Sequence, residues 1–139
     1  MSFARLLAAL ESLGVSEADG QSIWSVLAAV YHLGVAGATR INSAPGSRPV
    51  FANPAAAQRA ATLLGCASLD DLAGMAFHSA PVHQHAAGLV NGSGRSSFRT
   101  GSPVQPSVDK SLDPYEALEG FAQGLYVEAF SALVALINK

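Results

Sequence analysis

The last part of the chain, residues 114–139, constrains the fold more than any other stretch. Asp113 and Pro114 form an N-cap followed by a proline at the first helical position, so the pattern predicts a helix from there to the end. A helix that is apolar around much of its circumference is normally buried on more than one side. The apolar stripe is wider than one core face requires and comprises Leu118, Phe121, Ala122, Leu125, Tyr126, Ala129, Phe130, Leu133, Val134 and Ile137.

A second helix with the same property is predicted over residues 17–33. Ser16 is its expected cap, with Asp19 three residues further on, and Gly34 is its expected end. Alanines fill the spaces between its large apolar residues, which are Ile23, Trp24, Leu27, Val30, Tyr31 and Leu33. This helix is also expected to be covered on more than one side.

Shorter elements complete a fold that we expect to be mainly α. Turn residues between 35 and 53 separate two weak strand patterns, at 38–41 and 50–52. Three shorter helices are marked by their capping residues: Ser2 and Gly14 around residues 3–13, Asn53 and Gly65 around residues 54–64, and Ser68 before residues 69–77.

Residues 78–112 show no helical or strand period and are rich in serine, glycine and proline. A loop of roughly 35 residues within a compact domain is usually functional or disordered. We therefore divide the chain into a helical part at 1–77, a long flexible loop at 78–112 and a helix at 113–139. The chain stops at Lys139 without a capping glycine, which is expected of a cut through a longer sequence.

The composition excludes several classes of protein. Charged residues make up 13% of the chain and the net charge is -2, which gives no electrostatic basis for binding nucleic acid. The single cysteine, Cys66, cannot form an internal disulfide and favours a reducing, cytoplasmic compartment. Arg5 and Glu11 interrupt the N-terminal apolar run, so we predict neither a signal peptide nor a membrane span.

No catalytic or metal site is predicted. The two lysines, Lys110 and Lys139, follow no glycine, so the phosphate-binding P-loop is absent. His78, His83 and His85 are close in sequence, but no cysteine or carboxylate lies nearby to complete a zinc site. Cys66 follows a helix-ending glycine and is interpreted as an inert apolar filler.

One cluster in the loop has the character of a contact site. Arg95 and Arg99 flank Phe98 and two serines. Arginines bind carboxylates in a bidentate manner, so this cluster suits an acidic protein surface. The same composition is also typical of an unstructured linker, and that alternative stays open.

Three segments, in order, resemble the head of the myosin motors. Residues 23–34, which end in His32-Leu33-Gly34, resemble a helix in the upper part of the actin-binding region. Residues 57–66 and 69–77 resemble the helix pair that follows. Residues 117–138, which end in Ile137-Asn138, resemble the long helix that precedes the switch II motif.

Departures from the usual myosin pattern point to one class. Val35 stands where most myosins have asparagine, and Leu118-Glu119-Gly120 is similar to the class XVIII unconventional myosins. The resemblance implies that the chain is a helical segment of the motor's 50-kDa region. Its loop at 78–112 then takes the place of the cardiomyopathy loop, with Arg95, Phe98 and Arg99 as candidate actin contacts.

The resemblance also implies what the rest of such a protein supplies. The parent head would bind ATP with magnesium and the actin filament, as part of a myosin complex in the cytoskeleton. The P-loop, switch I and switch II do not occur here, so the chain alone should be inactive and hold no cofactor. Its direct partners would be actin and the remainder of the head.

Two rival interpretations remain. The first is a small helical module that oligomerises through the same apolar faces and has no motor role. The second is a hydrolase or metalloprotein that uses Cys66 or the loop histidines, which no local motif favours.

Overall fold

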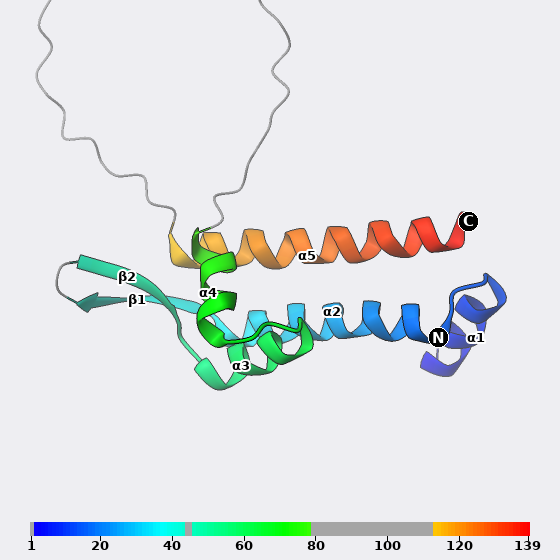
Figure 1. Ribbon diagram of the computed structural model, residues 1–139, viewed down its shortest axis with the longest axis horizontal. Coiled ribbons are helices and arrows are strands. Elements are labelled where there is room, and N and C mark those ends of the chain that lie inside the picture. Colours follow the sequence, from blue (N-terminus) through cyan, green and yellow to red (C-terminus); the bar gives the residue numbers. More distant parts are fainter. Residues whose placement is uncertain (1, 44–45, 79–112) are drawn as a thin grey trace, which may run out of the picture.

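A computed structural model describes residues 2–43, 46–78 and 113–139, and it is mainly α, as the sequence predicts. Two long helices, three short helices and one hairpin make up this described part (Figure 1). In chain order the elements are α1 (Phe3–Ser12), α2 (Glu17–Ala36), β1 (Ala38–Ser43), β2 (Gly46–Phe51), α3 (Pro54–Leu63), α4 (Leu69–His78) and α5 (Pro114–Ile137).

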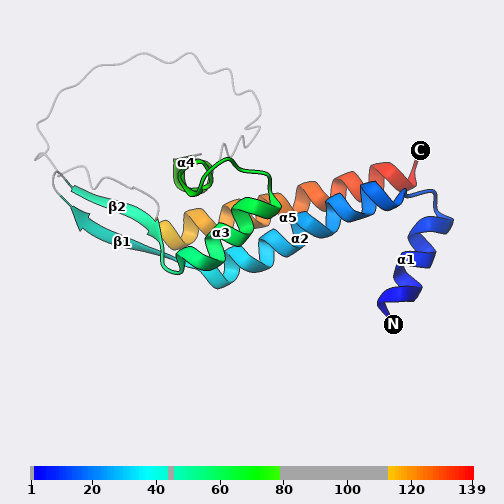
Figure 2. The ribbon, with the colours of Figure 1, turned by 60° about the horizontal axis from the view of Figure 1, so that its bottom comes forward.

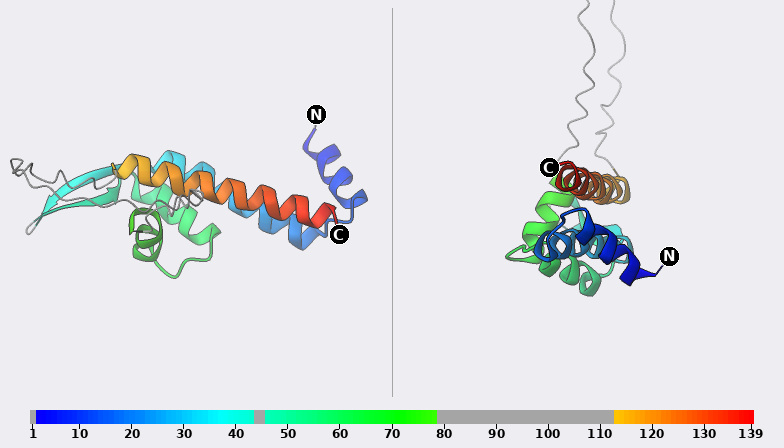
Figure 3. Two further views of the ribbon diagram at one scale, coloured as in Figure 1. Left: turned by 90° about the horizontal axis from the view of Figure 1, so that it is seen from above. Right: turned by 90° about the vertical axis from the view of Figure 1, so that its right-hand side faces the viewer.

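The two long helices, α2 and α5, lie side by side along the length of the molecule and run in opposite directions (Figures 1 and 3). Helix α3 packs on another side of α2, and α4 contacts both α3 and α5 (Figure 2). The hairpin extends from one end of α2, while α1 lies at the other end. Helix α2 is therefore covered by two different helices, as its wide apolar pattern predicts.

Small side chains let α2 and α3 approach closely. Four alanines of α3 are buried and recur at three- and four-residue spacing, which places them on one side of that helix. They pack in the core with Leu33 of α2 and Leu72 of α4, both fully buried. The α3 alanines are Ala56, Ala57, Ala60 and Ala61.

Helix α2 is one turn longer than predicted. We expected it to end at Gly34, but it continues to Ala36 and ends at Gly37, which has φ of 57°. The last turn continues because Leu33 and Ala36 are both buried in the core, and that burial outweighs the helix-weakening effect of Gly34. The Asn53 N–H then donates to the Ala36 carbonyl at 2.8 Å, which ties the helix end to the start of α3.

The two weak strand patterns do form strands. Strands β1 and β2 pair antiparallel, from Ala38 opposite Phe51 to Ser43 opposite Gly46. Both strands are longer than the predicted 38–41 and 50–52. Pairing supplies backbone hydrogen bonds to residues whose side chains gave little strand signal.

The structure confirms the predicted capping residues, and the other helix boundaries agree to within one residue, except that α5 ends at Ile137 and not at Lys139. Ser2, Ser16, Asn53 and Asp113 each accept a backbone N–H from the first turn of their helix, and Ser68 accepts the Asp71 N–H at 3.1 Å. Gly14 and Gly65 both have positive φ, of 82° and 72°. After each, the next N–H bonds back across six residues, which is the Schellman geometry of a helix end.

The described part of the chain corrects the loop boundary by one residue, because His78 still belongs to α4. The rest of the predicted loop, from 79 to 112, lies outside the described residues. Among the described helices, α5 alone has the length and apolar composition needed to cross a bilayer, with a mean hydropathy of 1.5 over its most apolar stretch. The core helix of a water-soluble protein can meet the same two conditions.

Candidate protein interface

Helix α5 has an inner face that packs and an outer face that does not. On the inner face Leu118 and Ala129 are buried, and Phe121, Ala122 and Leu125 pack partly against the core. This face lies on α2 (Figure 3). The spacing of three and four residues between these positions explains why one side of the helix is covered.

The outer face consists of Tyr126, Val127, Phe130 and Val134. Tyr126 is 54% exposed and Phe130 is 59% exposed. Residues 126, 130 and 134 are spaced by four, so they form a continuous ridge along the second half of α5. Single exposed apolar residues are common on proteins, but a contiguous ridge of large ones is typical of an interaction surface.

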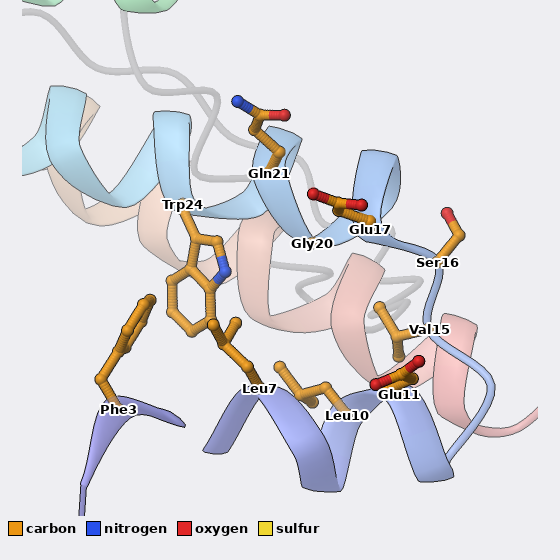
Figure 4. Close-up of a pocket in the computed structure, with 10 residues that line it drawn as sticks. All are labelled: Phe3, Leu7, Leu10, Glu11, Val15, Ser16, Glu17, Gly20, Gln21 and Trp24. Atoms are coloured by element: carbon orange, nitrogen blue, oxygen red, sulfur yellow. The ribbon is translucent and has the colours of Figure 1, made fainter. Parts of the chain in front are cut away.

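A second apolar surface lies between α1 and α2, where it forms a groove of about 580 Å³ (Figure 4). The Leu10 and Val15 side chains are buried at its closed end, where the two helices are joined. Phe3 and Trp24 contact each other edge to face near its open end, with ring centroids 5.4 Å apart. The groove residues are Phe3, Leu7, Leu10, Glu11, Val15, Ser16, Glu17, Gly20, Gln21 and Trp24.

The sequence pattern identified the first surface but not the second. The wide stripe on residues 114–139 predicted the outer face of α5 directly. For α1 the sequence predicted only the bounds of the helix, whereas in the structure Phe3 and Leu7 stay 60% and 41% exposed on a wall of the groove. The available signal was Phe3, a large aromatic residue on a helix of ten residues that is too short to bury it alone, so a partner such as Trp24 of α2 was needed.

The three candidate actin-contact residues, Arg95, Phe98 and Arg99, lie outside the described residues, as do His83 and His85. Cys66 is half-buried and packs at the edge of the core, in agreement with its interpretation as an apolar filler. The described ranges contain no group of three or more histidine, cysteine or acidic side chains that could hold a metal. Within those ranges the two exposed apolar surfaces suit packing between polypeptides.

The comparisons with known proteins extend over almost the whole chain. It is 40% identical over 139 residues to the mouse protein "Unconventional myosin-XVIIIa". The chain is similar to a segment of the class XVIII myosins. This class XVIII myosin-like chain is also 35% identical over 138 residues to the human protein "Unconventional myosin-XVIIIb".

Each match covers 99% of this chain but only 6% of the mouse protein and 5% of the human one. No profile of a protein family matches the chain, and no solved structure matches it. The class XVIII myosin-like chain thus corresponds to one short segment of much longer relatives, and their activities do not transfer to it from similarity alone.

Proposed function

We propose that the chain is a structural segment of a class XVIII-like myosin head, in the upper part of its 50-kDa region. The observation that carries this proposal is the outer face of α5, whose large apolar side chains are 40% to 59% exposed in the described structure. In a complete head, the remaining polypeptide would cover this face. The similarity to two class XVIII myosins supports the same placement.

Burial of the outer face of α5 would contribute substantially to the free energy of folding of a complete head. Moving an apolar side chain the size of Val, Phe or Met from water into a protein interior is worth about 1.5–3 kcal/mol. The outer face presents four large side chains at or above 40% exposure: Tyr126, Val127, Phe130 and Val134. Because these side chains are already about half covered, completing their burial would contribute about 3–6 kcal/mol in total, which reaches the lower end of the stability of a small domain.

A substitution in the complete head tests this placement. Phe130→Glu should lower the folded yield and the melting temperature of a class XVIII-like head that contains this segment, because a carboxylate would be buried without a partner. Gln58→Glu is the matched control, since it adds the same charge on an exposed side of α3. An unchanged melting temperature in the Phe130→Glu head would rule out burial of the outer face there.

The proposal extends to actin binding and to ATP. In such a head residues 79–112 would take the cardiomyopathy-loop position and contact the actin filament through Arg95, Phe98 and Arg99. ATP and magnesium would bind to motifs that this chain lacks, in a cytoplasmic, cytoskeletal myosin. The support for this extension is the similarity to class XVIII myosins and the cationic, aromatic character of the cluster.

Charge reversal tests the actin contact. The pair Arg95→Glu and Arg99→Glu in the complete head should weaken co-sedimentation with actin filaments at low salt, since surface charge pairs are strongest there. Arg5→Glu with Arg59→Glu is the control, because both arginines are exposed on other helices and the net charge changes equally. Equal actin affinity for the two double variants would remove the cluster from the actin site.

A second candidate function is a helical module that oligomerises through the outer face of α5. The same exposed side chains favour it, because like faces of two copies can cover each other. Sedimentation of the chain by itself separates the two candidates. A defined oligomer that unfolds cooperatively supports the module, whereas an aggregating or loosely packed chain supports a segment of a larger head.

A further inference from the structure

The groove between α1 and α2 has features of a binding site that the proposed function does not use. It is lined on one side by α1 and on the other by the first half of α2, and Phe3 and Leu7 point toward it from α1 (Figure 4). The Phe3 ring is 60% exposed, although it contacts the Trp24 ring. The two apolar walls of the groove are therefore in place, but their side chains remain partly exposed to solvent.

The charge around the groove has one sign. Its lining residues include two carboxylates, Glu11 on α1 and Glu17 on α2, and no lysine, arginine or histidine. Both glutamates are exposed, so they are free to meet a cation that arrives from solvent. An apolar cleft with acidic residues at its edge complements an apolar ligand that carries positive charge beside it.

The indole of Trp24, which lines the same groove, has an unsatisfied hydrogen-bond donor. Its Nε1 atom is buried without a hydrogen-bond partner in the described chain. A Cβ at Gly20 would lie 3.8 Å from this nitrogen, an ordinary van der Waals distance, so the indole nitrogen lies next to Gly20. A buried N–H donor normally has a partner, and this one would gain an acceptor from a ligand only if the indole turned toward the groove.

We propose that this groove binds a short amphipathic helix of another polypeptide segment, with lysine or arginine beside its apolar face. The dimensions agree, because the ten-residue α1 offers a wall about 15 Å long, which matches two to three turns of helix. Apolar side chains spaced by three and four would contact Leu7 and Trp24, and the cations would lie near Glu11 and Glu17.

Trp24 is the only tryptophan of the chain, so its fluorescence reports occupation of the groove directly. The probe is a synthetic, tryptophan-free peptide of about 15 residues with leucines at helical spacing and lysines beside them. The matched control peptide has glutamates in place of the lysines. The full chain would carry Phe130→Gln and Val134→Gln, which remove the outer face of α5 as a competing apolar site.

The lysine peptide should shift the Trp24 emission in a saturable manner, and the glutamate peptide should not. Neutralising both carboxylates, Glu11→Gln with Glu17→Gln, should weaken binding of the lysine peptide about threefold to tenfold at low salt, as expected for two exposed charge pairs. The conservative pair Glu11→Asp with Glu17→Asp should retain most of the affinity, and circular dichroism checks that each variant keeps its helix content.

The proposal is overturned by any of three results. The first is no emission change with the lysine peptide at millimolar concentration. The second is equal affinity for both peptides, which would indicate non-selective apolar capture. The third is unchanged affinity after Glu11 and Glu17 are neutralised.

Discussion

At the scale of single residues, Gly34 and Gly37 lie three positions apart and have opposite roles. Gly34 is inside α2 with nothing within 4 Å of where a Cβ would lie. Gly37 has φ of 57° and ψ of 178°, a region of backbone space that is almost restricted to glycine. The first glycine therefore weakens a helix, whereas the second one is required to end it.

Alanine substitutions should separate these roles. Gly37→Ala should lower the free energy of unfolding by about 1–3 kcal/mol, because a Cβ strains this conformation. Gly34→Ala should raise it by up to about 1 kcal/mol, since alanine favours a helix and meets open space. Urea unfolding followed by circular dichroism measures both, and equal midpoints for the two variants would contradict the assigned end of α2.

At the scale of elements, the contact between α2 and α3 depends on small side chains. The buried alanines of α3 leave no space for a larger residue, because Ala57 and Ala60 have no exposed surface. Ala55, on the same helix, is exposed. The buried side of α3 therefore sets the distance to α2, whereas larger side chains can be accommodated on its exposed side.

Enlarging one alanine on each side tests this arrangement. Ala60→Leu should destabilise the chain by about 1–3 kcal/mol, because overpacking forces the helices apart or the side chain out of its rotamer. Ala55→Leu is the control and should stay within about 0.5 kcal/mol of the parent chain. Thermal unfolding of the two variants decides the matter, and a similar loss in both would mean that α3 does not pack through its alanines.

At the scale of the whole molecule, α5 packs against the core through its inner face, and its outer face is exposed to solvent. Leu118 is 4% exposed and contributes to the core, whereas Phe130 is directed away from it. The two faces therefore differ in what they add to the stability of this chain by itself. The inner face has therefore gained more free energy from burial than the outer face has.

Truncation of each face should show this difference. Leu118→Ala should cost about 2–5 kcal/mol, the usual loss for a leucine that leaves a cavity in a core. Phe130→Ala should cost under about 0.5 kcal/mol in the dilute chain and should reduce its self-association. Unfolding measured at two protein concentrations tests both, and a large loss for Phe130→Ala at low concentration would mean that the outer face is already covered.

The sequence alone predicted most of the elements, for local reasons. A capping side chain and a stop glycine act within one turn, so Ser16, Asn53 and Gly65 located helix ends without any tertiary information. The wide stripe on residues 114–139 likewise predicted surplus apolar surface on α5, since helical periodicity fixes which residues share a side. The resemblance to class XVIII myosins came from ordered motifs and is supported by the comparisons.

Other features required the tertiary structure, because they depend on residues far apart in the chain. Helix α2 passes Gly34 because Leu33 and Ala36 pack against α3, an energy that no local pattern contains. The hairpin is longer than its strand signal since each strand completes the hydrogen bonds of the other. The groove that holds Phe3, Leu7 and Trp24 exists only through the angle between α1 and α2, and periodicity within a single helix specifies no such angle.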